Sequence, residues 1–267
     1  MEWAILLLLA VVLAVHWFDY SRAVTEYTFA QPVTADNLRS VLSEKTPVVV
    51  EIGAIPWRPE IAANASWIVR AEEDGVRADE AQPEGQKMSE WLKGSGRTIH
   101  NNRALAEEME LATGLTDIDE GRSIWWLPGL YDVSVDILGA DEVVGLSWVS
   151  AERQWIGCSS GGPLLVWLVH SRYRRYLPSP DAVNPWNLTP AEAPYIGRVQ
   201  YIEVRIKPGW ALGLPAHWGW ALKNEGPEAW MWEATQQSGL SWCLNQLPSV
   251  VHNIQSHIES LSSPLEE

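Results

Sequence analysis

The stretch IKPGWALGLPAHWGWAL, residues 206–222, decides the fold class. It holds two short apolar runs set apart by turn residues: Pro208-Gly209 precedes the first run, and Pro215 closes it before the second begins. Proline cannot donate a ladder hydrogen bond and glycine tolerates turn geometry, so both mark strand ends rather than strand interiors. The stretch therefore predicts two consecutive strands, over residues 211–214 and 217–223, joined by a tight connection.

Short runs of the same kind recur on both sides of this stretch. In residues 199–207, Ile202, Val204 and Ile206 share one face with Gln200, and tyrosine and charged side chains take the other. Such alternation is typical of a strand with one buried face. The whole series, punctuated by Gly, Pro, Asp or Asn, indicates a mainly β domain: a sandwich, jelly roll or barrel. The other predicted strands are 46–53, 67–69, 124–127, 132–138, 142–149, 163–170 and 229–234.

An apolar run stands near the N-terminus. Residues 3–18, WAILLLLAVVLAVHWF, contain no formally charged side chain. A membrane-spanning helix takes about 20 residues, and Tyr20 with the flanking tryptophans extends the run toward that length. No Lys or Arg precedes the run and bulky residues follow it, which favours a retained anchor over a cleaved signal peptide. We therefore expect a single-pass membrane protein that contacts the lipid bilayer through residues 3–20, with Arg22 keeping the domain on the cytoplasmic side.

Charge and cysteine content exclude several classes of protein. The chain has 34 acidic and 19 basic side chains, a formal charge of −15, which is the opposite of what neutralising nucleic-acid phosphates requires. Cys158 and Cys243 form no CxxC pair or Cys/His cluster, so neither a disulfide framework nor a zinc site is predicted. Whether these two cysteines pair is left open. The 17 tryptophans, against 2 phenylalanines, indicate a core built from indoles.

Three parts follow from these patterns. Residues 1–22 are the anchor, residues 23–240 the β-domain, and residues 241–267 an amphipathic helix with a polar tail. Flanking helices are predicted before residue 42, over residues 102–113, and over residues 249–261. Residues 71–86 hold six acids and are predicted to be a solvated loop.

The order P-G-x-x-L-x-L-P-x-x-W-x-W in residues 208–220 resembles a known family. It is similar to the closing strands of the cupin-like, JmjC-type double-stranded β-helix, the family of protein hydroxylases and demethylases that use iron and 2-oxoglutarate. Residues 46–50, TPVVV, look like an early strand of that family, and residues 145–178 resemble its strands that run to a basic residue and a proline. The resemblance implies a double-stranded β-helix, or jelly roll, and the sequence patterns add a few flanking helices and an N-terminal transmembrane helix.

The resemblance also implies an iron site of two histidines and one carboxylate, and here the sequence departs from the family. Trp220 stands where the distal histidine is expected, and residues 148–162 contain no histidine. An indole N–H is only a donor and cannot replace a metal-binding imidazole. His100, expected in a loop, His170 and the pair His257 and Glu259 form no substitute set, and residues 159–162 are predicted to be a turn. We therefore expect no catalytic residue, metal or cofactor, and a vestigial pocket at Trp218, Trp220, His217 and Gln154.

Four tryptophans recur with period two: Trp218, Trp220, Trp230 and Trp232. Each pair therefore shares one face of its strand. The favoured interpretation is a barrel filled by indoles where a metal cavity would otherwise be. The alternative is that exposed indoles bind a partner, with Trp230 and Trp232 as the candidates.

The sequence thus predicts a membrane-anchored, non-catalytic structural or interaction protein with a protein partner. Degenerate cupin-like chains with an apolar N-terminal segment are similar to proteins of large DNA viruses, and this analogy suggests a virion component at the internal membrane beneath a capsid. Two alternatives stay open. One is an oxygenase dependent on Fe(II) and 2-oxoglutarate whose ligands lie at other positions, and the other is a glycan-binding module that uses tryptophan.

Overall fold

A computed structural model describes residues 45–51, 99–103, 129–178 and 183–238, together with Val11, Ala14, Val41 and Ala106. The predicted membrane anchor lies outside the described residues apart from Val11 and Ala14, as do the strands at 67–69 and 124–127, the acidic loop and the C-terminal helix. Among the described residues, no helix has the length and apolar character needed to cross a membrane.

The described chain is mainly β. Between residues 170 and 201, the chain forms three short 3-10 helices: η3 (Ser171–Tyr176), η4 (Pro185–Asn187) and η5 (Ile196–Arg198). The strands are β1 (Val48–Glu51), β2 (Ile99–Asn102), β3 (Gly129–Gly139), β4 (Val143–Trp148), β5 (Arg153–Gly161), β6 (Leu164–His170), β7 (Tyr201–Ile206), β8 (Trp210–Pro215), β9 (Trp218–Asn224) and β10 (Glu228–Ser238).

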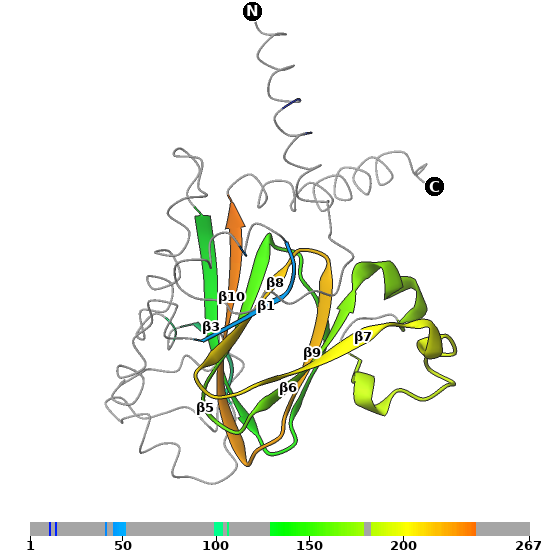
Figure 1. Ribbon diagram of the computed structural model, residues 1–267. Helices are drawn as coiled ribbons and strands as arrows, with labels where there is room; N and C mark the ends of the chain where they lie inside the picture. The colour runs from blue at the N-terminus through cyan, green and yellow to red at the C-terminus, as the bar shows by residue number, and fades with distance from the viewer. Residues whose placement is uncertain are drawn as a thin grey trace, which may run out of the picture.

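The strands form two antiparallel sheets that face each other (Figure 1). One sheet has six strands in the order β1-β8-β5-β10-β3-β2, and the other has four in the order β4-β9-β6-β7. The pairs are nested: β6 pairs with β7, β5 with β8, β4 with β9, and β3 with β10. Successive pairs fall alternately in the two sheets, as in one long hairpin wound into a helix. This winding is the double-stranded β-helix, or jelly roll, that the sequence predicted.

The turn residues within residues 206–222 lie at strand ends, as predicted from the sequence. Gly209 has a φ of +85°, in the left-handed region that glycine adopts without strain, and it reverses the chain between β7 and β8. Pro215 is the last residue of β8, and β9 starts at Trp218 after a short turn. Both strands predicted from residues 206–222 are confirmed.

Apolar side chains from both sheets fill the space between them. The fully buried members of this core include Ile156, Val166, Leu212, Leu214 and Leu222. The outer face of the four-stranded sheet is covered by the segment between β6 and β7, which packs Tyr173, Tyr176 and Trp186 against a buried cluster that includes Trp167. That segment lies beside β7, away from β3 and β10 (Figure 1).

Two predictions for the backbone were wrong. Residues 159–161, expected to be a turn, are the end of β5, and β5 is a central strand paired with both β8 and β10. Glycine suits the end of this strand, because Gly161 has a φ of +90° and a Cβ added to it would lie 2.3 Å from the Glu228 carbonyl oxygen. His100, expected in a loop, lies in β2.

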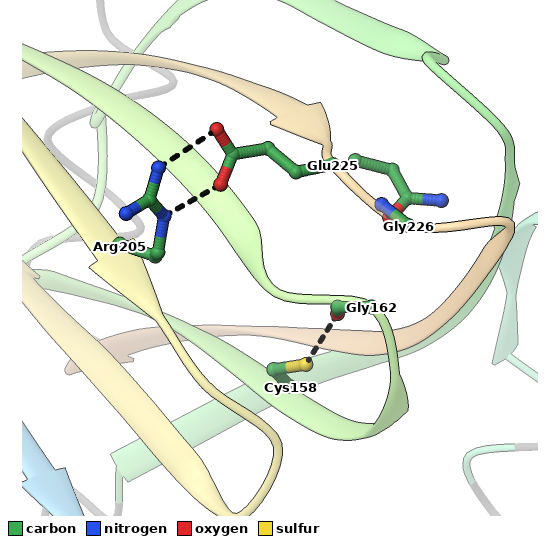
Figure 2. A network of polar contacts seen from close by, with 6 residues as sticks. Cys158, Gly162, Arg205, Glu225 and Gly226 are labelled. Carbon is green, nitrogen blue, oxygen red and sulfur yellow. Dashed lines mark hydrogen bonds and ion pairs between the residues drawn. The ribbon is translucent and has the colours of Figure 1, made fainter.

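One end of the barrel is closed by tight turns (Figure 2). A Cβ added to Gly162 would lie 2.4 Å from the Cα of Gly226, so the two backbones meet at a distance only glycine allows. Asn224 links this end by donating to the Gly139 carbonyl at 2.7 Å and accepting from the Gly226 N–H at 2.9 Å. Arg205 on β7 holds Glu225 through two hydrogen bonds of 2.6 and 3.0 Å.

Cys158 lies in the interior next to this closed end. Its thiol is free, and Sγ donates to the Gly162 carbonyl at 3.5 Å (Figure 2). Burial raises the pKa of the thiol to about 12. Because the thiolate is the reactive form, Cys158 is an inert core residue.

Candidate functional site

The candidate site is the barrel interior around the two tryptophans of β9. Trp218 and Trp220 both point between the sheets, and their exposed fractions are 0% and 3%. On the neighbouring strand β6 they lie opposite His170 and Leu168. Two large indoles therefore occupy successive inward positions of the same strand.

A polar network crosses the interior from β9 to β10. The Trp220 Nε1–H donates to Oε1 of Gln154 at 3.2 Å, and the Gln154 Nε2 donates to Oε2 of Glu233 at 3.0 Å. Gln154 thus bridges the four-stranded sheet and the six-stranded sheet. The structure brings two of the predicted pocket residues, Trp220 and Gln154, into direct contact.

The carboxyl group of Glu233, at the end of this network, has a raised pKa. Burial raises the pKa of Glu233 to about 8, and the negative charge of Asp136 on β3 acts in the same direction. The hydrogen bond from Gln154 acts in the opposite direction. Two carboxyl groups close together in a low-dielectric interior resist carrying two negative charges. Burial and the charge of Asp136 both favour the protonated form of Glu233.

Two histidines lie at the barrel end opposite the tight turns. His170 is 4% exposed, its Nδ1 accepts from the Arg172 N–H at 3.1 Å, and its ring meets Trp218 edge to face with centroids 5.5 Å apart. Burial, followed by the charges of Arg172 and His217, lowers the pKa of His170, so the imidazole is neutral at pH 7. His217, the remaining predicted pocket residue, lies in the β8–β9 turn with a φ of +69°. Its carbonyl accepts from the Ser171 N–H at 2.9 Å, so it holds the barrel end together through its backbone.

The side chains in this region do not match the iron site of the resembled family. Among the residues that the structure describes, no three His, Cys, Asp or Glu side chains are grouped closely enough to hold a metal ion. The interior donors that do come together are two carboxyl groups, Glu233 and Asp136, beside the amide of Gln154. A Fe(II) oxygenase needs two imidazoles and one carboxylate on one side of the metal.

The second pair of tryptophans lies on the opposite face of the six-stranded sheet. Trp230 and Trp232 are paired across β3 with Ile137 and Val135, away from the barrel interior. Trp232 is fully buried, which corrects the expectation that its indole is offered to a partner. Trp230 is half-buried, and its Nε1–H donates to Glu228 at 2.7 Å.

Sequence reasoning missed the acidic members of the network. Glu233 follows Trp232 on β10, and Asp136 lies between Val135 and Ile137 on β3. Period-two alternation puts both acids on the face opposite Trp232 and Val135, and charged side chains opposite an apolar face ordinarily point to solvent. Here that face is the barrel interior, because the apolar side chains are buried on the outer face of the same sheet.

Comparisons with known proteins give structural neighbours only. No protein-family model matches the sequence, and no curated protein matches it. Part of the chain is similar to RmlC from Streptococcus suis, solved in complex with dTDP-D-xylose, with a TM-score of 0.26 and 10% identity over 39% of this chain and 43% of that one. It is also similar to the Drosophila melanogaster CENP-C cupin domain, with a TM-score of 0.27 and 5% identity over 39% of this chain and 59% of that one. A second CENP-C structure, bound to CAL1, gives a TM-score of 0.27 and 4% identity over 39% and 60%. The chain therefore spans less than two thirds of each of these neighbours.

Proposed function

We propose that this chain is a non-catalytic interaction protein, built on a double-stranded β-helix of the cupin-like, JmjC type and held at a membrane by its N-terminal apolar segment. The observation that carries the proposal is the occupancy of the interior: Trp218 and Trp220 are buried side by side, and Trp220 stands where the family resemblance implies an iron ligand. Because side chains fill the interior, recognition of a protein partner would use the outer surface. A role in a virion stays a prediction from analogy.

The polar network supports the same proposal. Trp220, Gln154 and Glu233 come from three different strands, and their hydrogen bonds of 3.2 and 3.0 Å use the indole N–H and both ends of the amide. Satisfied buried networks rigidify a core and specify one arrangement of it. An oxygenase instead needs open coordination positions for its cosubstrate and for oxygen.

Iron binding by the full-length protein tests this proposal. The chain is solubilised in detergent, loaded anaerobically with Fe(II) and 2-oxoglutarate, desalted, and analysed for iron. We expect far less than one iron per chain, because the described residues offer no metal-binding cluster of His, Cys, Asp or Glu side chains. One iron per chain, lost in a Glu233→Gln, Asp136→Asn double variant, would overturn the non-catalytic assignment and locate the site.

Membrane attachment is measured on the same expressed protein. Residues 3–18 carry no formal charge, so we expect the chain to stay in the membrane pellet after extraction with alkaline carbonate. Quantitative release into the supernatant would contradict the anchor while leaving the iron result untouched.

A further inference from the structure

The segment between β6 and β7 carries a continuous row of guanidinium and phenol groups. The Arg175 guanidinium lies over the Tyr176 ring at 4.8 Å from its centroid, and Arg198 lies over Tyr195 at 5.3 Å. Between them, the rings of Tyr176 and Tyr195 meet edge to face with centroids 6.3 Å apart. We call these four residues the Arg–Tyr row. It joins η3 to η5, two helices that contact each other in the fold.

The row is open to solvent and locally positive. Arg175, Tyr195 and Arg198 are exposed, and a Cβ added to Gly197 would meet nothing within 4 Å. The segment, residues 171–200, contains four arginines, one aspartate and one glutamate, a net charge of 4 − 2 = +2. That glutamate, Glu192, accepts from the N–H and hydroxyl of Thr189 at 3.0 and 2.8 Å. The whole chain carries −15, so the row is a positive patch on a strongly acidic protein.

Stacking prepares these arginines for a carboxylate ligand. A guanidinium held over an aromatic ring is already partly ordered, and its N–H groups can form two parallel hydrogen bonds with a carboxylate. No ion pair joins Arg175 or Arg198 to a carboxylate within the described part of the chain. Arginine and tyrosine are also among the residues that contribute most to protein interfaces.

We propose that the Arg–Tyr row binds an acidic segment of a partner protein, whose carboxylates pair with Arg175 and Arg198 while its chain lies across Tyr195. This inference rests on the proposed function, since it names the recognition surface of an interaction protein. A short peptide with few charges meets the local positive patch. An anionic bilayer or a nucleic acid presents an extended array of phosphates, which the acidic remainder of the chain repels.

Binding of a short fluorescent peptide that carries two glutamates to the full-length protein in detergent tests the proposal. We expect saturable binding that weakens as salt is raised, because exposed charges are screened. The variant Arg175→Gln with Arg198→Gln should weaken binding by about tenfold or more, as loss of central interface arginines does. The matched control Arg103→Gln with Lys207→Gln removes two positive charges elsewhere, and its affinity should stay within about twofold of the original.

A third variant separates planar recognition from charge alone. Arg175→Lys with Arg198→Lys keeps both charges but loses the planar, stacked fork, so we expect an intermediate affinity. Equal weakening by the Arg103 and Lys207 control, or no peptide binding at all, would overturn the proposal. Tighter binding to phosphatidylserine vesicles or to a single-stranded oligonucleotide than to the peptide would also overturn it. So would a dimer that the Arg175 and Arg198 variant dissociates, because the occupant would then be a second copy.

These outcomes are independent of the iron measurement. The row lies on the outer side of the four-stranded sheet, and the proposed function is tested in the barrel interior. Stoichiometric iron with intact peptide binding would overturn the non-catalytic assignment alone. Absence of both iron and peptide binding would overturn the recognition surface alone.

Discussion

On β10, Met231 and Glu233 point into the barrel, and Trp230 and Trp232 point to the outer face of the same sheet. The neighbouring strand β3 repeats the division, with Asp136 inside and Ile137 outside, and both are buried. Alternating side chains on this sheet therefore separate two buried layers rather than a core from solvent. Polar side chains such as Glu233 and Asp136 can therefore face the interior when the opposite face of the sheet is buried as well.

The largest effect is expected from two fully buried tryptophans, one in each layer. Trp232 is fully buried, and Trp218 is its counterpart in the barrel interior. Truncating either residue to alanine removes an indole and leaves a cavity, so each change should lower the free energy of unfolding by about 3–5 kcal/mol. Urea denaturation of the two variants measures the costs. A Trp232→Ala cost below about 1 kcal/mol would show that the outer face is not a second core.

The contact between β10 and β5 predicts the next effect. A Cβ added to Gly157 would lie 2.0 Å from Cε2 of Trp232, so Gly157→Ala forces the indole to move and should cost about 1–3 kcal/mol. The same change in a Trp232→Ala background should cost much less, because the obstructing ring is gone. Gly197→Ala is the matched control and should stay within about 0.5 kcal/mol, since nothing lies within 4 Å of its added Cβ. Additive costs at Gly157 and Trp232 would contradict the contact.

The smallest effect is pH-dependent and belongs to the inner layer. The pKa of Glu233 is raised to about 8 in the folded chain and returns toward 4.5 on unfolding, so the folded state holds the proton more tightly. Its contribution to stability is complete below pH 4.5 and is lost as pH rises toward 8. Glu233→Gln imitates the protonated form, so it should flatten this decline and add about 1 kcal/mol at about pH 8.

Thermal unfolding at several pH values measures the change. Glu225→Gln is the control of opposite sign, because the hydrogen bond from Arg205 lowers the pKa of Glu225 and its contribution is lost as pH falls. A Glu233→Gln variant with the same pH dependence as the original chain would show that the carboxyl group is not buried as described.

Individual residues show which parts of the fold can be predicted from the sequence. Pro208, Gly209 and Pro215 place the ends of β7, β8 and β9 because their backbone restrictions act locally. The centre of the large sheet is harder to predict, because it depends on pairing between strands that are distant along the chain. Residues 159–161 look like a turn, and they form part of a strand because Ser160 and Gly161 pair with Trp230 and Ala229 of β10. Strand pairing across long separations is not written in local propensity.

The candidate site also has residues that can be predicted from the sequence and residues that cannot. Period two puts Trp218 and Trp220 on one face of their strand, and the family resemblance implies that this face lines a pocket that also includes Gln154. Glu233 and Asp136 escape such reasoning, because alternation does not say which of two faces lies inside. Their proximity arises only when β10 and β3 become neighbours.

By itself, then, the sequence determined what is local: turn positions, the period-two faces of the strands, the strong negative charge and the apolar run at residues 3–18. The tertiary structure alone decided which face of the six-stranded sheet encloses the interior. It also assembled the Arg–Tyr row, whose members Arg175 and Arg198 come from separate helices. The physical reason is that propensity and periodicity act over a few residues, and burial and electrostatic environment are set by neighbours that are distant along the chain.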